Sequence, residues 1–189
     1  MALLSAIVAR AARTLPLVAL LLAGRGLAAQ AVRASEYQVK AVFLFNFAQF
    51  VDWPAEAFPA TDTPLVICVL GNDPFGGALD QTVRDERLGG RSFQVRRHQS
   101  VDEIQTCHIL FISRAEGDRP EAILAGLKDR PILTVSDANG FAERGGMIRF
   151  VTDRNRIRLQ LNLAAAEAAR LTISSKLLRV AEVITRTRS

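Results

Sequence analysis

The sequence predicts an α/β fold, a three-layer sandwich around a mixed, mainly parallel sheet of five or six strands. Apolar runs of strand length alternate with helix-like segments, an order typical of parallel sheets. The runs 65–70 and 107–112 are almost wholly apolar, as expected of central strands covered on both faces. Two late strands, 147–151 and 156–161, flank a polar turn and predict an antiparallel hairpin.

The first element after the N-terminal segment is expected to be a helix over residues 37–51. Ala41, Leu44 and other apolar residues recur there near helical spacing. Phe43 points elsewhere, so the helix is apolar on more than one side. Such a helix is buried on both faces or packs against a partner. The helix is expected to end before Pro54, because proline disfavours helical backbone in the residue before it.

The other elements follow from apolar periodicity and from turn residues. Further strands are expected at 92–97 and 131–135, and helices at 76–84 and 120–129. Asn162 is expected to cap a last helical region, which breaks near residues 171–173 and restarts at Ser174.

The N-terminus has the pattern of a secretory signal. Arg10 and Arg13 precede a short apolar run, 15–23, and Ala29 and Ala31 have the spacing of a cleavage site. A membrane anchor would need about 20 apolar residues, more than this run supplies. We therefore expect export to the periplasm.

The predicted domain organisation is a signal peptide over residues 1–31 and one mature domain over 32–189. Removing the signal peptide lowers the formal net charge from +5 to +2. The basic balance of the whole chain is therefore no argument for nucleic-acid binding.

Residue types that carry catalysis or bind metals are sparse. The two histidines, His98 and His108, do not cluster with other ligands as a zinc site requires. Ser113 follows a strand but lacks the flanking glycines of a hydrolase nucleophile, and no acid–base pair stands out. We expect neither an enzyme nor a bound metal or cofactor.

The turn formed by Gly71, Asn72 and Asp73 is the candidate ligand contact. It follows a strand and precedes a helix, the arrangement of a phosphate cradle, but it lacks the spacing of a nucleotide-binding loop. An ordinary turn between strand and helix is the alternative. This turn carries the rival hypothesis that the protein is a periplasmic small-molecule-binding module.

The two cysteines, Cys68 and Cys107, lie in separate apolar strands. Neighbouring strands bring backbones within disulfide range, and an oxidising compartment favours a bridge. Two buried reduced thiols are the alternative.

Several arginines surround the predicted hairpin. Arg156 and Arg158 share one face of the second strand, whereas Leu159 and Leu161 share the other. The basic face is either solvated or a docking surface for acidic groups.

Two blocks of sequence resemble the YfiR family. Residues 37–54 read YQVKAVFLFNFAQFVDWP and resemble that family's opening helix. Residues 150–163, FVTDRNRIRLQLNL, and residues 173–181, ISSKLLRVA, resemble its C-terminal part. The blocks bracket the mature chain in matching order.

The resemblance implies a periplasmic repressor of a YfiN-like inner-membrane diguanylate cyclase, which lowers cyclic-di-GMP signalling and so affects biofilm formation. It also implies a YfiB-like outer-membrane lipoprotein as a second partner, and homodimers. The periplasmic domain of a sensor kinase is an alternative partner. The expected docking residues are Arg156, Arg158, Gln160 and Asn162, together with the exposed part of the first helix.

Two departures from the family pattern concern its function. Cys68 and Cys107 match one family disulfide, but the second pair found in some relatives is absent from residues 140–151. Relatives often carry an acid where Gln160 stands, so the choice of partner is expected to differ here.

Overall fold

The computed structural model describes residues 35–116, 120–154 and 156–184 of the chain. Its internal contacts divide the chain into Met1–Tyr37 and Gln38–Ser189. The sheet and its core belong to the second unit. The predicted signal segment lies outside the described residues.

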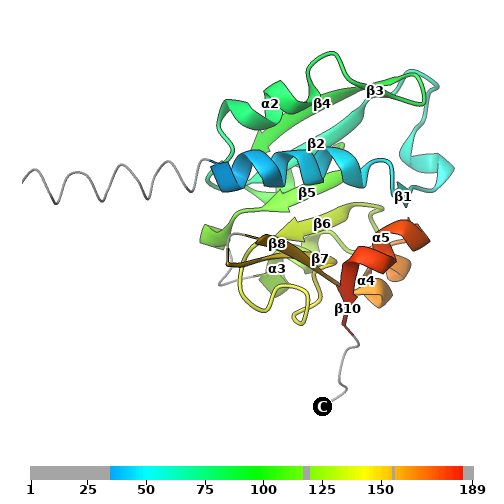
Figure 1. The fold of residues 1–189 in the computed structure, drawn as a ribbon. Helices are drawn as coiled ribbons and strands as arrows, with labels where there is room; N and C mark the ends of the chain where they lie inside the picture. The colour runs from blue at the N-terminus through cyan, green and yellow to red at the C-terminus, as the bar shows by residue number, and fades with distance from the viewer. Residues whose placement is uncertain (1–34, 117–119, 155, 185–189) are drawn as a thin grey trace, which may run out of the picture. The chain divides into compact units, whose positions relative to one another are not determined.

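The described residues form an eight-stranded sheet in the order β10-β8-β7-β6-β5-β2-β4-β3 (Figure 1). Its six main strands confirm the predicted ones: β2 (Leu65–Leu70), β4 (Arg91–His98), β5 (Ile109–Ile112), β6 (Leu133–Ser136), β7 (Ile148–Asp153) and β8 (Arg156–Leu161). The predicted number of five or six was too low because each edge gains a short strand, β3 (Arg87–Leu88) or β10 (Ala181–Val183). Five neighbouring pairs are parallel, and the β7–β8 and β3–β4 pairs are antiparallel.

Helices cover both faces of the sheet, as the predicted three-layer sandwich requires. The described helices are residues 35–47, α2 (Gly77–Val83), α3 (Pro120–Gly126), α4 (Leu163–Ala168) and α5 (Ser175–Val180), with short 3₁₀ turns η1 (Ala55–Ala57), η2 (Val101–Glu103) and η3 (Arg114–Glu116). Ile123 of α3 packs with Cys68 and Leu110 on one face. On the other face the first helix packs against the sheet, where Phe47 stacks on Phe150 and Phe45 contacts Phe93.

A buried ion pair fixes the first helix to the sheet. Lys40 Nζ donates to Asp137 Oδ2 at 2.7 Å, and each side chain is 1% exposed. Arg114 also donates to the Asp137 carbonyl at 3.0 Å. Because a buried charge without its counter-ion is costly, this pair holds the helix in one position along the sheet.

The first helix ends earlier than its sequence pattern predicts. It ends at residue 47, and β1 (Val51–Asp52) then pairs antiparallel with β9 (Thr172–Ile173). Residues 48–50 leave the helix through short-range bonds such as Phe50 N–H to the Phe47 carbonyl. Val51 stands opposite Ile173 of β9, and the Phe50 carbonyl just before it accepts from the Ser174 N–H at 2.8 Å, so the tertiary pairing outweighs the helical periodicity.

Candidate docking surface

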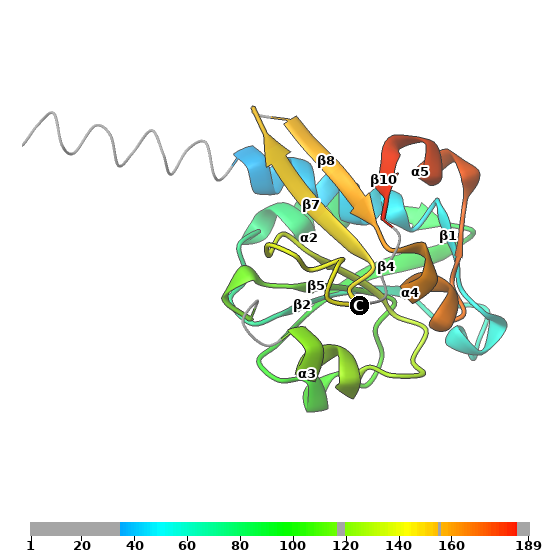
Figure 2. The same ribbon diagram turned by 90° about the horizontal axis from the view of Figure 1, so that it is seen from below.

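The β7–β8 hairpin extends beyond the strands that flank it in the sheet. β7 and β8 pair at six register positions, but β6 pairs with β7 at only two, Val135 with Ile148 and Ser136 with Arg149. Because β10 pairs with β8 as far as Leu159, only residues 151–153 and 156–158 form a two-stranded ribbon, which Figure 2 shows projecting past the other strands. Phe150 at the base of this ribbon packs against Phe43 of the first helix.

The opposite face of the hairpin is polar. Because neighbouring residues of a strand alternate between faces, Arg149 and Gln160 point away from the first helix. Arg149 donates to Gln160 Oε1 at 2.9 Å, and Gln160 Nε2 donates to Glu182 of β10 at 3.5 Å. Arg149 also donates to Asn139 Oδ1 at 2.9 Å. Three strands are thus joined by a chain of polar side chains near the base of the hairpin.

Arg156 and Arg158 lie further out on the same face. Both are exposed, and the Arg158 side chain keeps 67% of its accessible surface. Arg158 Nη2 lies 3.5 Å from Asp153 Oδ2, and Asp153 also stands opposite Arg156 in the strand register. The structure therefore places Arg156, Arg158 and Gln160 on one accessible strip.

Asn162 does not belong to that strip. It is 3% exposed, its Oδ1 accepts from the Ala165 N–H at 3.1 Å, and its Nδ2 donates to the Ala142 carbonyl at 2.9 Å. The side chain caps α4, as the sequence predicts, and ties that helix to the loop before β7. Its burial makes a docking role untenable, so this candidate is corrected to a structural one.

Two exposed valines lie on the first helix. Val39 and Val42 are 47% and 46% exposed and stand three residues apart, on one side of the helix. They form an apolar patch outside the core, separate from the polar strip on the hairpin. The sequence prediction of a helix that is apolar on more than one side agrees with this exposure.

The Gly71 turn is closed by the protein's own side chains. Asp73 Oδ1 accepts from the Phe75 N–H, and its Oδ2 accepts from Arg97 Nε at 2.7 Å. Arg97 also pairs with Asp80, and its hydrogen bond lowers the pKa of that carboxyl. Gly71 has a φ of +81°, which favours glycine. The turn's geometry thus has a local explanation, and ligand contact by Gly71, Asn72 and Asp73 stays a prediction.

The structure contains the disulfide that the sequence favoured. Cys68 and Cys107 are bonded, with their Cα atoms 6.0 Å apart. Cys68 sits in the central strand β2 and Cys107 lies just before β5, the neighbouring strand. The bridge is buried in the core cluster beneath α3.

The histidines have separate surroundings. His108 is 1% exposed; its Nδ1 accepts from the Val66 N–H at 3.0 Å, and its Nε2 lies 3.0 Å from the Ala57 carbonyl. Burial lowers the pKa of His108. His98 stands at the end of β4, 3.9 Å from Glu103. Among the described residues, no group of three or more His, Cys, Asp or Glu side chains is placed to hold a metal ion.

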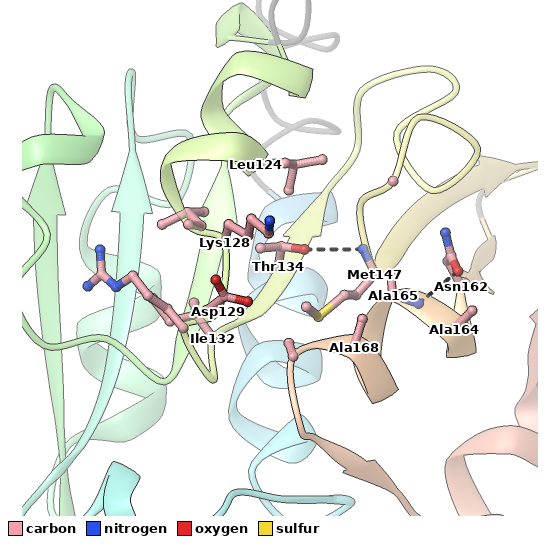
Figure 3. Close-up of a pocket in the computed structure, with 14 residues that line it drawn as sticks. Leu124, Lys128, Asp129, Ile132, Thr134, Met147, Asn162, Ala164, Ala165 and Ala168 are labelled. Carbon is pink, nitrogen blue, oxygen red and sulfur yellow. Dashed lines mark hydrogen bonds between the residues drawn. The ribbon is translucent and has the colours of Figure 1, made fainter.

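A pocket of about 330 Å³ lies between the end of α3, the start of β7 and α4 (Figure 3). Lys128 and Asp129 lie on one side, and Met147 and Ala168 on the other. The Gly71 turn contributes no residue to its lining. No sequence pattern indicated this pocket, because its walls come from segments far apart in the chain.

The described helices include none that is both long and apolar enough to cross a bilayer.

The fold and the accessible strip together define an α/β sandwich domain with a polar, partly uncovered sheet face. The YfiR/HmsC-like family model matches residues 37–182, so the chain belongs to the YfiR/HmsC-like family. This confirms the resemblance seen in the sequence. No individually curated protein matches the chain.

Proposed function

We propose that this protein is an exported regulator, which binds the periplasmic part of a membrane diguanylate cyclase and represses cyclic-di-GMP synthesis. Membership of the YfiR/HmsC-like family over residues 37–182 carries this proposal. The role needs a binding surface and no catalytic group, in keeping with a non-enzymatic protein.

The proposed compartment is the periplasm, reached by a signal peptide over residues 1–31 and followed by one mature domain over 32–189. The disulfide between Cys68 and Cys107 supports this location, because such bonds persist in oxidising compartments and are rare in the cytosol.

The proposed docking surface is the strip formed by Arg156, Arg158 and Gln160, with Val39 and Val42 as a second contact. The strip is accessible and sits on a hairpin whose strands pair at six register positions. The valines add apolar area of the kind that protein interfaces bury. A sensor kinase, a YfiB-like lipoprotein and a second copy of the chain are further partners that the same surfaces could serve.

Repression follows if the regulator binds the inactive arrangement of the cyclase more tightly than the active one. A ligand shifts such an equilibrium only by its difference in affinity for the two states. A shift from mostly active to mostly inactive cyclase needs a preference of about 10⁴-fold.

The test is deletion of the gene in cells with and without a co-expressed partner cyclase, with cyclic-di-GMP measured in extracts. We expect the nucleotide to rise on deletion only when the cyclase is present, and to fall again on complementation with the full chain. A version lacking residues 1–31 is the matched control and should not complement. Equal cyclic-di-GMP in all these strains would refute the proposed function.

A further inference from the structure

The distal part of the hairpin, residues 151–154 and 156–158, forms the hairpin arm. It lies beyond the two positions at which β6 pairs with β7. Its Thr152, Asp153, Arg156 and Arg158 are exposed, and Val151 and Ile157 are half-buried. An isolated two-stranded ribbon is marginally stable in water, so the packing of Phe150 and the base of the hairpin must hold the arm in place.

The charges of the arm are not balanced within it. Asp153 is its one acid among the described residues, and this carboxylate stands opposite Arg156 while lying 3.5 Å from Arg158. Arg156 and Arg158 are two residues apart on one strand, so their guanidinium groups lie on the same face. One carboxylate thus serves two cations that repel each other.

The base of the hairpin differs in this respect. Arg149 is held by Gln160 and Asn139 and lies 4.0 Å from Glu143, with its side chain 17% exposed. The interactions of this arginine are made within the protein. The excess positive charge is therefore concentrated on the projecting arm, where it is most accessible to an incoming molecule.

We propose that the hairpin arm captures carboxylates of an acidic patch on the protein partner, through Arg156 and Arg158. This inference rests on the proposed function and names the chemistry of the partner's contact surface. A guanidinium group presents a planar fork that pairs with a carboxylate through two parallel hydrogen bonds. Asp153 can neutralise only one of the two guanidinium groups. A second carboxylate, supplied by the partner, neutralises the other.

The same chemistry could in principle serve an anionic membrane surface. Electrostatic membrane binding uses clusters of roughly 4–8 basic residues. The arm offers Arg156 and Arg158 on β8, with Asp153 facing them from β7, and Arg154 in the turn raises its arginines to three among the described residues, fewer than such a cluster. This spacing favours an acidic protein surface.

The test measures association of the full exported chain with the purified periplasmic domain of the partner cyclase used in the deletion experiment, by stopped-flow fluorescence. The Arg156→Glu/Arg158→Glu variant should associate about tenfold more slowly at low salt. The difference should shrink at high salt (about 0.5 M), where exposed charges are screened.

The matched control is Arg84→Glu/Arg96→Glu, which reverses the charge of two exposed arginines, one at the end of α2 and one on β4. It makes the same change in net charge away from the arm and should stay within about twofold of the unchanged chain. Thermal unfolding of both variants checks that each is folded.

The outcomes separate the two proposals. If the unchanged chain does not bind the cyclase domain, the proposed function fails. If it binds and the arm variant behaves like the control, the arm inference alone is wrong. If the arm variant instead loses only its binding to phosphatidylglycerol vesicles, the arm recognises lipid and the inference is also wrong.

Discussion

At the scale of single residues, Gln160 shows how one side chain sets the character of the docking surface. Its amide accepts from Arg149 and donates toward Glu182. An acid at this position would place two carboxylates side by side, which repel each other. The glutamine thus lets β8 sit between a cation and an anion, and it leaves the arginines further along the strand as the surface's charged groups.

His108 is the residue whose ionisation should affect stability. The Val66 N–H donates to Nδ1, so Nε2 must carry the proton and donate to the Ala57 carbonyl. This is the neutral form, and burial lowers the pKa of His108 in the folded protein. A second proton would leave the Val66 N–H facing another donor.

We expect the free energy of unfolding to decrease as the pH falls below about 6.5. The unfolded chain binds a proton at His108 there, whereas the folded chain, with its lowered pKa, does not. In urea unfolding measured across this range, His108→Gln should lose much of the decrease. His98→Gln should keep it, and equal pH profiles for the two variants would contradict this role of His108.

At the scale of elements, caps and connections decide where the C-terminal helices stand. α4 begins at the Asn162 cap and α5 at the Ser174 cap, whose Oγ accepts from the Leu177 N–H. Between them β9 pairs with β1. The two short helices are therefore positioned by their ends, and Asn162 also ties α4 to Ala142.

Asn162→Ala should lower the free energy of unfolding by about 2 kcal/mol, because it removes a cap and also the bond from Nδ2 to the Ala142 carbonyl, which then keeps only the Gly145 N–H as a donor. Ser174→Ala removes a cap alone and should cost about 1 kcal/mol. Urea denaturation measures both. A smaller loss for Asn162→Ala than for Ser174→Ala would show that the bond to Ala142 contributes little.

At the scale of the whole molecule, the disulfide joins Cys68 of β2 to Cys107, which lies just before β5 and 39 residues further along the sequence. The intervening segment contains α2, the edge strand β3 and its neighbour β4. The bridge therefore closes this segment into a covalent loop, and the disulfide itself is buried in the core beneath α3. A crosslink of this span stabilises chiefly by restricting the unfolded chain.

Replacing both cysteines, Cys68→Ala/Cys107→Ala, should lower the free energy of unfolding by about 3–4 kcal/mol. The measurement is denaturant unfolding with and without reductant. Reductant should shift the midpoint of the unchanged chain toward that of the variant and leave the variant where it is. An unchanged midpoint for the reduced parent chain would contradict a stabilising bridge.

Most of the fold could be predicted because its signals are local. A few neighbouring residues are enough to predict each of three features: the apolar run of β2, the hairpin of β7 and β8, and the Asn162 cap. The end of the first helix could not be predicted in this way. Val51 continues a helical pattern, but the strand with which it pairs lies more than a hundred positions later in the sequence.

The candidate site divides in the same way. The sequence by itself determined the family, the cysteine pair and the alternation that sets Arg156, Arg158 and Gln160 on one face. Only the tertiary structure decided that Asn162 is buried, that Lys40 pairs with Asp137, and that the hairpin arm extends beyond β6. Periodicity fixes which way a side chain points, whereas exposure and ion pairing depend on which distant segments pack against it.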